Sequence, residues 1–415
     1  MADIHRTRPR SAIVVGAGIV GLSTAWFLQE HGVSVTVVDR TGVAAGASWG
    51  NAGWIAPALS IPLNDPRTLR YALRSLANRS GPIRISPSLD PGLWRFLLRF
   101  TTNCRESSWK RAVQDNLTLN RECMTAYDAL VSDGVDAPIT DAPITALFHS
   151  SADAEHLLDQ LRRLADAGQP SSTTELGRAE LREQVPLASS AVTVGIRING
   201  QRFVDPGKFL HALGRSVVER GAELRIDDIV DVRPFAGGVV VQPRGSAALT
   251  TDAAVIATGA WLPELVRRWM WIPVQAGRGY SFTVPVERPV SGPIYLPDVR
   301  VACTPLDAQL RVTSVMELRR PGAPASAGVV DAMVESTGRY LEGVRWAERD
   351  DVWVGPRPLS PDGRPLVGEV CGRLFVAGGH GMWGMKQGPA TGRLLAAQIA
   401  TGQRPPGLRG FDPLR

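Results

Sequence analysis

The chain contains little lysine. Only Lys110, Lys208 and Lys386 are lysines among its 46 basic residues, so arginine supplies nearly all of the positive charge. The 40 acidic residues are interspersed with the basic ones and leave a formal net charge of +6. A nucleic-acid-binding arm or a polybasic membrane segment needs a long run of like charge, and the sequence has none. We therefore expect no nucleic acid partner.

Cysteine is also scarce. Cys104, Cys123, Cys303 and Cys371 lie far apart, without a C-x-x-C pair or a nearby histidine set that seats zinc or an iron–sulfur cluster. This spacing predicts a reduced cytoplasmic chain without a metal. With 415 residues, of which 44% are hydrophobic and 21% charged, the composition is that of a globular protein long enough for two domains.

An uncharged stretch at 11–29 follows three arginines and resembles a signal peptide or a membrane anchor in length. Three glycines at fixed spacing interrupt it, no small-residue cleavage site lies close behind it, and a strand-like segment follows directly. We therefore expect no signal peptide and no transmembrane segment, and we expect a cytoplasmic protein. Peripheral contact with the inner face of the membrane stays open.

A glycine-rich turn lies inside this stretch. The apolar run at 12–15 predicts a buried strand, 22–31 a helix that stops at Gly32, and 33–38 a second strand. The first strand and the helix are joined by Gly16-Ala17-Gly18-Ile19-Val20-Gly21, and Asp39 follows 18 residues after Gly21. This order of elements is typical of a dinucleotide-binding unit.

Each part of this motif has a physical role. Gly16 allows the tight turn, Gly18 lets the backbone approach a pyrophosphate, and Gly21 permits close packing of the helix. The N-terminus of the helix attracts phosphate charge. Asp39 can accept hydrogen bonds from ribose hydroxyls. The motif by itself does not distinguish a nicotinamide from a flavin dinucleotide.

The remaining sequence predicts further elements in blocks. The segment 41–64 is uncharged and rich in glycine, proline and tryptophan, which predicts a structured loop. Helical spacing recurs at 92–101, 112–132 and 153–167, which we assign to a second domain, and at 206–220, 329–341 and 388–401. Strand-like runs occur at 223–232, 238–242, 252–257, 278–284, 299–304, 309–315 and 374–377. The helix at 206–220 is expected to lead into a meander of short strands.

The segment behind the dinucleotide motif favours a flavin. A nicotinamide enzyme normally continues with another helix and strand, whereas 46–54 is a long loop of small residues. Here the chain resembles the FAD-dependent amine and amino-acid oxidoreductases, the family that includes D-amino-acid oxidase, glycine oxidase, sarcosine oxidase and the D-amino-acid dehydrogenases. Further marks of the family are Asp205-Pro206, A-T-G-A-W at 257–261, G-R-G-Y-S at 277–281, G-P-R-P-L-S-P-D-G at 355–363, G-G-H-G at 378–381 and P-A-T-G at 389–392. The segments 51–53, 277–281 and 357–363 are most similar to the bacterial D-amino-acid dehydrogenase branch.

The resemblance implies an α/β flavoprotein. Its Rossmann-like FAD-binding domain would comprise 10–60, 200–265 and 357–415, and a second, mixed-sheet substrate-binding domain would comprise 61–199 and 266–356. The residues implied to bind FAD are Gly16, Gly18, Ile19, Val20, Gly21, Asp39, Arg40, Ala47, Ser48, Asn51, Ala52, Gly53, Val230, Thr258, Gly259, Trp261, Gly381, Gly384, Met385 and Lys386.

The resemblance also addresses how the flavin is attached. A branch with histidine-linked flavin has its histidine where this chain has Gly50, and the sarcosine oxidase branch has its linking cysteine where this chain has Gly355. We therefore expect non-covalent FAD. Cys303 and Cys371 are expected to be buried small apolar residues.

Arg357 and Lys386 are the first candidates for contact with substrate. The resemblance puts Arg357 where glycine oxidase and D-amino-acid oxidase hold the substrate carboxylate, in a loop made rigid by its prolines. A guanidinium grips a carboxylate with two parallel hydrogen bonds. Lys386 matches an offset at which the sarcosine oxidase branch has a substrate-contacting lysine, and the predicted helix begins just behind it, near Gly388. An exposed lysine is the alternative.

Tyr280 and His380 are weaker candidates. Tyr280 can donate to a carboxylate, but a tyrosine in a strand is more often an ordinary packed side chain. His380 is a candidate general base, although its position between glycines suggests a structural imidazole. Trp49, Trp54 and Trp383 are candidates for the walls of the pocket, with a place in the core as the alternative.

The sequence therefore predicts oxidation of an α-amino or imino acid, in first place a D-amino acid. Hydride passes from the substrate α-carbon to flavin N5, and a quinone-type acceptor takes the electrons. The imine then hydrolyses to a 2-oxo acid and ammonia. One alternative is an oxidase of glycine or sarcosine type that reduces O2 to H2O2. Another is a flavoprotein whose FAD is structural and which serves as a binding or scaffold subunit.

Overall fold

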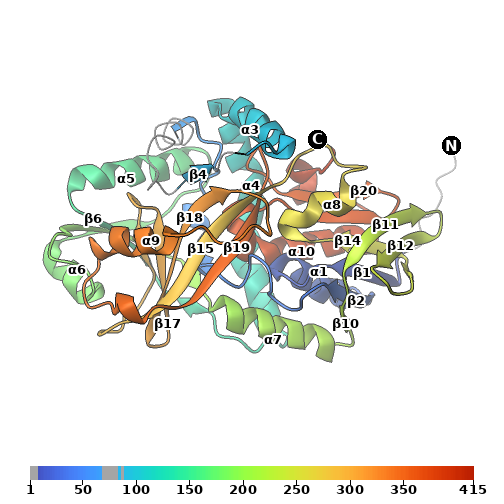
Figure 1. Ribbon diagram of the computed structural model, residues 1–415, viewed down its shortest axis with the longest axis horizontal. Coiled ribbons are helices and arrows are strands. Elements are labelled where there is room, and N and C mark those ends of the chain that lie inside the picture. Colours follow the sequence, from blue (N-terminus) through green and yellow to red (C-terminus); the bar gives the residue numbers. More distant parts are fainter. Residues whose placement is uncertain (1–7, 68–82, 86–87) are drawn as a thin grey trace.

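We describe the protein from a computed structural model, which defines residues 8–67, 83–85 and 88–415. Within these residues two large sheets lie next to each other, the first on the right of Figure 1 and the second on the left. The predicted fold class, an α/β unit with a parallel sheet followed by a mixed sheet, is confirmed.

The first sheet has the strand order β10-β2-β1-β14-β21-β20. Its parallel strands are β10 (Glu223–Ile226), β2 (Ser34–Asp39), β1 (Ser11–Val15), β14 (Ala253–Ile256) and β21 (Leu374–Gly378), and β20 (Leu366–Cys371) pairs antiparallel at one edge. Along β1, Ala12 and Val14 pack in one apolar cluster, while Ile13 and Val15 pack in another. Both faces of the sheet are therefore buried, as is usual for parallel strands.

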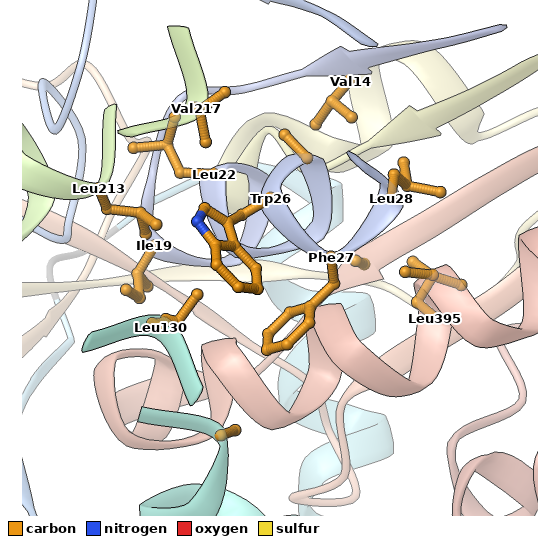
Figure 2. Close-up of a cluster of buried hydrophobic side chains, with 14 of the residues drawn as sticks. Val14, Ile19, Leu22, Trp26, Phe27, Leu28, Leu130, Leu213, Val217 and Leu395 are labelled. Carbon is orange, nitrogen blue, oxygen red and sulfur yellow. The ribbon is translucent and has the colours of Figure 1, made fainter. Parts of the chain in front are cut away.

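Four helices cover one face of this sheet. They are α1 (Ile19–Glu30), α4 (Glu106–Ser132), α7 (Pro206–Glu219) and α10 (Gly384–Thr401). Trp26 of α1 is fully buried among apolar side chains of its neighbours, including Leu130, Leu213 and Val217 (Figure 2). Its Nε1 donates a hydrogen bond to Ser216 Oγ at 3.1 Å. The uncharged stretch at 11–29 is thus the buried unit of β1, turn and α1.

The helix α10 begins four residues earlier than predicted, at Gly384 instead of Gly388. Pro389 lies inside it and has no N–H to donate to the carbonyl of Met385. The hydroxyl of Tyr127 donates to that carbonyl instead, at 2.8 Å. Because a side chain from α4 replaces the missing bond, the helix extends past the proline, and Lys386 lies in its first turn.

The other face of the first sheet is covered by an antiparallel meander and a short helix. The meander consists of β11 (Ile229–Phe235), β12 (Gly238–Pro243) and β13 (Leu249–Thr251), and the helix is α8 (Leu262–Val266). The prediction of a single strand at 223–232 is therefore wrong. Its first half is β10, which pairs in parallel with β2, and only its second half enters the meander. The apolar pattern does not specify which partner a strand finds.

The second sheet is mixed and has the strand order β19-β15-β18-β17-β16-β6-β8-β7, with β4 next to β18. Its strands are β4 (Ile83–Ile85), β6 (Ile144–Phe148), β7 (Thr173–Leu176), β8 (Val194–Ile198), β15 (Gln275–Pro285), β16 (Ile294–Leu296), β17 (Val301–Leu306), β18 (Gln309–Leu318) and β19 (Asp350–Leu359). The helices of this part are α3 (Pro91–Asn103), α5 (Ser151–Asp166), α6 (Arg178–Gln184) and α9 (Val329–Gly338).

The loop predicted at 41–64 contains no α-helix, only the short strand β3 (Trp54–Ile55) and the 3-10 turn Pro57–Leu59. β3 joins β9 (Arg202–Phe203) and β5 (Thr140–Asp141) in a small sheet. The predicted domain boundary at 357 falls inside β19, which pairs with β15 along its length. The chain therefore leaves the second sheet only after Leu359.

Candidate cofactor and substrate site

A cavity lies at the carboxyl ends of the parallel strands. Val15, Val38 and Gly378, which end or nearly end β1, β2 and β21, line it together with Ala257 behind β14. Ligands of open α/β sheets bind at this edge. The cavity is the natural place for a dinucleotide.

The glycine turn forms the floor of this cavity. Gly16 has a φ of +114°, and a Cβ there would lie 2.5 Å from the carbonyl oxygen of Ala257. A Cβ on Gly21 would lie 1.8 Å from the carbonyl oxygen of Gly16. At Gly18, which lines the cavity, a Cβ would meet only Ser48 Oγ, at 3.2 Å. Gly16 and Gly21 are thus required by the protein's own packing, whereas Gly18 leaves space for a ligand.

The N-terminus of α1 faces the same space. Gly18 is its N-cap and offers no side chain, and Ile19 N–H donates to Ser48 Oγ at 3.2 Å. The carboxylate of Asp39 accepts from Ala17 N at 2.8 Å and from Thr41 N at 2.9 Å, so it also fixes the turn. An uncapped helix N-terminus beside a glycine turn binds phosphate through its free N–H groups.

Most of the residues predicted to bind the cofactor line this cavity. They are Gly16, Gly18, Ile19, Val20, Asp39, Arg40, Ala47, Ser48, Asn51, Thr258, Gly259, Trp261, Gly381, Gly384 and Met385. The guanidinium of Arg40 lies 4.0 Å from the ring centroid of Trp261, and the two side chains together form one wall. Thr258 Oγ1 is buried and has no hydrogen-bond partner in the described part of the chain, which leaves it available to a ligand.

Five residues predicted for the cofactor do not line the cavity. Gly21 acts through packing, as described above. The carbonyl of Ala52 accepts from Thr304 Oγ1 at 2.7 Å, and Gly53 adopts a φ of +77°. Val230 is exposed, because alternate residues of a strand point to opposite faces, and its neighbour Ile229 lines the cavity instead. Lys386, the fifth, is described below.

Arg357 lies at the same cavity, on β19 and not in the rigid loop that the prolines predicted. Its Nη1 donates to the carbonyl of Val315 at 2.7 Å, and the guanidinium lies over Gly279, where a Cβ would be 2.1 Å from Cζ. No acidic side chain among the described residues pairs with it. Burial lowers the pKa of Arg357 to about 10, so the side chain remains a cation at neutral pH.

The carbonyl that holds Arg357 comes from a strained residue. Val315 has a φ of +61°, a conformation that a β-branched residue rarely adopts. It lies where the pairing of β15 with β18 shifts register. Strain of this kind persists only where surrounding structure enforces it, and it concentrates at functional sites.

Tyr280 does not face the cavity, so the prediction that it contacts substrate is wrong for this geometry. Gly277 is the direct partner of Arg357 across β15 and β19, and Tyr280 lies three residues further along, on the opposite face of the sheet. Its hydroxyl donates to Glu317 Oε2 at 2.8 Å and accepts from Ser326 N at 2.8 Å. Tyr280 is therefore an ordinary packed side chain of a strand, which was the alternative to a contact with substrate.

His380 lines the cavity, but its environment opposes a role as a base. Its Nε2 lies 2.9 Å from Thr391 Oγ1, and its Nδ1 is buried without a partner among the described residues. Burial lowers the pKa of His380 to about 3, so the imidazole is neutral. A group with this pKa is a poor match for proton abstraction near pH 7.

Lys386 is a buried lysine and not an exposed one. Its Nζ donates to Ser60 Oγ and lies 4.7 Å from the ring centroid of Trp383. Burial lowers the pKa of Lys386 to about 7. The side chain does not line the cavity but lies behind it, between α10 and the turn at 57–60.

Gly50 and Gly355, the positions that the resemblance matched to flavin tethers, are tightly packed. A Cβ on Gly50 would lie 2.1 Å from Cδ1 of Trp353, and one on Gly355 would lie 3.1 Å from Cα of Ala47. Cys303 is buried as expected, whereas Cys371, at the end of β20, is exposed and corrects that prediction. Neither cysteine lines the cavity.

Sequence reasoning missed several cavity residues. Asp227, Asp228 and Ile229 line it because β10 joins the parallel sheet and ends at the same edge as β2. Trp353, which does not line the cavity, was missed as well: it packs against Trp49 and Gly50, and its Nε1 is buried without a partner among the described residues. The alternation of β19, had that strand been recognised, could have indicated Trp353.

Together the sheet, the turn and the uncapped helix define a dinucleotide-binding α/β protein. The chain belongs to the FAD dependent oxidoreductase family, whose model matches residues 11–398. It is 30% identical to a D-amino acid dehydrogenase of Methylobacterium radiotolerans, over 95% of this chain and 96% of that protein, and 27% identical to a D-amino acid dehydrogenase of Agrobacterium fabrum, over 94% and 96%.

Solved structures share the fold. The glycine oxidase of Geobacillus kaustophilus superposes with a TM-score of 0.73 at 21% identity, over 98% of this chain and 99% of that one. The iminodiacetate oxidase of a Chelativorans species superposes with a TM-score of 0.70 at 20% identity, over 97% and 98%. The family's cofactor is FAD, and the glycine turn, the uncapped α1 and the unpaired Thr258 hydroxyl fit it. Among the described residues, no helix has the length and apolar character needed to cross a bilayer.

Proposed function

We propose that the protein oxidises an α-amino or imino acid, in first place a D-amino acid, with FAD held non-covalently. The observation that carries this proposal is Arg357, a cation at the edge of the dinucleotide cavity without an acidic partner in the described residues. A partly buried guanidinium without a counter-ion is costly unless a ligand supplies one. The carboxylate of an amino acid has the charge and the planar shape that it requires.

In this scheme the cofactor and the protein have separate roles. FAD supplies the acceptor for a hydride from the substrate α-carbon. Arg357 binds and orients the carboxylate with the N–H groups that Val315 does not use. The N-terminus of α10, which no side chain caps within the described residues, contributes Gly384 and Met385 to the cavity, so its dipole favours negative charge there.

The proton of the substrate amine needs no protein base in this scheme. His380 is neutral and hydrogen-bonded to Thr391, and the amine enters in its neutral form. The imine product then hydrolyses in water to a 2-oxo acid and ammonia, while a cyclic imino acid stops at the imine.

A quinone-type acceptor is proposed because the sequence relatives are named dehydrogenases. The rival is an O2-using oxidase, favoured by the glycine oxidase and iminodiacetate oxidase among the structural neighbours. We also propose two domains, divided as the sequence predicted except that the last boundary lies after Leu359 and that α4, which packs on the parallel sheet, belongs with the FAD-binding domain. The FAD-binding domain would then contain the parallel sheet and the substrate-binding domain the mixed sheet.

The test is anaerobic bleaching of the flavin by a panel of D- and L-amino and imino acids, followed by reoxidation with air or a quinone. Bleaching by a D-amino acid and rapid reoxidation by quinone alone is the expected result. Stoichiometric H2O2 at a comparable rate would establish the oxidase instead. No bleaching by any member of the panel would favour a structural flavin.

Arg357→Lys is the matched variant for this test. The charge remains but the two-pronged geometry is lost, so we expect at least a tenfold loss of substrate capture at unchanged FAD content. If bleaching slows less than twofold and benzoate still binds as a competitor, the carboxylate is held elsewhere.

A further inference from the structure

The face of the second sheet that carries Arg357 is polar, although it is buried. Gly277 of β15 is the direct partner of Arg357, and alternate residues of β15 from Gly277 onward lie on the same side. These include Ser281 and Thr283, and Arg311 of β18 is the direct partner of Thr283. The three side chains are 2%, 7% and 5% exposed. Because buried polar side chains need hydrogen-bond partners, the segment that covers this face has to supply them.

The loop 46–53 lies against this face. Arg311 Nη1 donates to the carbonyl of Trp49 at 2.8 Å. Thr304 of β17 is the direct cross-strand partner of Arg311, and its Oγ1 donates to the carbonyl of Ala52 at 2.7 Å. Two neighbouring side chains of one sheet thus hold two backbone carbonyls of one loop. We call Arg311 and Thr304 the loop clamp.

Arg311 is itself fixed by Asp351 of β19. Its Nη2 donates to Asp351 Oδ2 at 2.8 Å, across the intervening strand β15 (Figure 1). Asp351 has a φ of +50°, which is uncommon for a residue other than glycine, and it lies where the pairing of β15 with β19 shifts register. Such bulges redirect a side chain. Here the bulge directs a carboxylate onto Arg311 and neutralises its buried charge.

The loop held in this way forms part of the cofactor cavity. Each of the two held carbonyls directly follows a residue that lines the cavity, since Trp49 follows Ser48 and Ala52 follows Asn51. Between 41 and 53 the backbone forms no helix or strand that could fix the loop by itself. The position of the cavity wall therefore depends on contacts with the second sheet.

We propose that Arg311 and Thr304 are positioning residues for FAD. They hold the loop 46–53 in the shape that the cofactor requires before the cofactor binds. A loop that is ordered in advance loses less conformational entropy on binding, so the complex is tighter. The inference rests on the non-covalent FAD of the proposed function, and it holds whichever amine the enzyme oxidises.

FAD affinity tests the loop clamp. The FAD-loaded protein is diluted, free FAD is separated by ultrafiltration, and the Kd is obtained from its fluorescence. Arg311→Met removes a charge-assisted bond and should raise the Kd about tenfold or more. Thr304→Val keeps the shape but loses the hydroxyl, and should raise the Kd about fivefold or more. Thr304→Ser keeps the hydroxyl and should restore an affinity close to that of the wild type.

Limited proteolysis reports the position of the loop directly. Chymotrypsin cuts after aromatic residues, and Trp49 is the one aromatic residue in the sequence from 41 to 53. At saturating FAD, Arg311→Met and Thr304→Val should be cut after Trp49 faster than the wild type, as measured by the mass of the fragment 1–49. Thr304→Ser should be cut like the wild type.

Matched controls use the same kinds of bond away from the cavity. Arg349 Nη1 donates to the carbonyl of Trp346 at 3.1 Å and its Nη2 to Asp331 Oδ1 at 2.7 Å, which is the bonding pattern of Arg311. Thr193 Oγ1 donates to the carbonyl of His149 at 2.7 Å, as Thr304 does to its loop carbonyl. Arg349→Met and Thr193→Val should keep wild-type FAD affinity and wild-type cleavage.

Thermal unfolding of every variant accompanies both measurements, and a folding defect in one clamp variant leaves the other as the test. Three results would overturn the proposal. These are clamp variants with wild-type FAD affinity and wild-type cleavage, controls that lose as much affinity as the clamp variants, and a Thr304→Ser variant that loses as much as Thr304→Val.

These outcomes are separate from those of the proposed function. Neither readout uses an amine, so failure of the proposed amine oxidation would leave both unchanged. A covalent flavin would show itself as a yellow pellet after acid precipitation, and the cleavage rate after Trp49 would then decide on the loop clamp by itself.

Discussion

Gly279→Ala tests how the protein positions Arg357 without altering the arginine itself. The added Cβ would lie 2.1 Å from Cζ of Arg357, and an ordinary contact begins at 3.4 Å, so the guanidinium must move by roughly 1.3 Å. Moving it stretches or breaks the bond from Nη1 to the Val315 carbonyl. The variant should therefore fold and bind FAD while presenting a displaced cation to the substrate.

The expected loss follows from the geometry. A displacement of about 1 Å at a reacting centre can cost on the order of 100-fold in rate, and loss of one charge-assisted hydrogen bond costs about 1.5 to 3 kcal/mol, which is roughly tenfold to more than a hundredfold. We expect kcat/KM for the amino acid to fall at least tenfold, with benzoate affinity reduced in parallel.

The assay is anaerobic stopped-flow bleaching of the flavin, with FAD content and thermal unfolding measured on the same samples. Gly322→Ala is the control, because a Cβ there meets nothing within 4 Å. Gly279→Ala with full FAD content, normal bleaching and normal benzoate affinity would refute the placement of the substrate carboxylate at Arg357.

Three further predictions concern the cofactor and the buried lysine. Gly18→Val puts a branched side chain where a pyrophosphate must approach backbone, so the protein should purify colourless; full FAD occupancy would mean that the cofactor turn is misplaced. Acid precipitation should leave the yellow colour in the supernatant, and a yellow pellet would show a covalent flavin. Because burial lowers the pKa of Lys386 to about 7 from the ordinary 10.5, the unfolded chain binds more protons than the folded one between these values, and wild-type stability rises with pH across that window. The stability of Lys386→Met relative to wild type should therefore fall from pH 7 to pH 10 in urea unfolding, and a pH-independent difference would contradict the buried charge.

The sequence by itself determined the dinucleotide unit. The strand at 12–15, the turn from Gly16 to Gly21 and the helix behind it are all found, and the signals are local. Gly16 adopts a positive φ that other residues rarely adopt. A short apolar run between turns is typical of a buried strand. The sequence also predicted the helices α3, α4, α5, α7 and α9. The apolar spacing that indicates each of them lies within one continuous segment.

Tertiary structure decided the substrate side of the site. Arg357 was expected in a loop but lies in β19. The sequence left open whether Tyr280 contacts substrate or packs as an ordinary strand residue, and it faces the other way. Which side of a sheet a residue faces depends on the register between strands about 80 residues apart, and a shift by one residue reverses it.

The same reason explains β10 and Lys386. β10 joins β2 across almost 200 residues, and Lys386 enters the helix because Tyr127 of α4 supplies the bond that Pro389 cannot. Local backbone preferences can be read from neighbours in the sequence. For contacts between distant segments, the sequence pattern is compatible with many alternative pairings of strands and helices. Only the packing of the complete fold selects one of them.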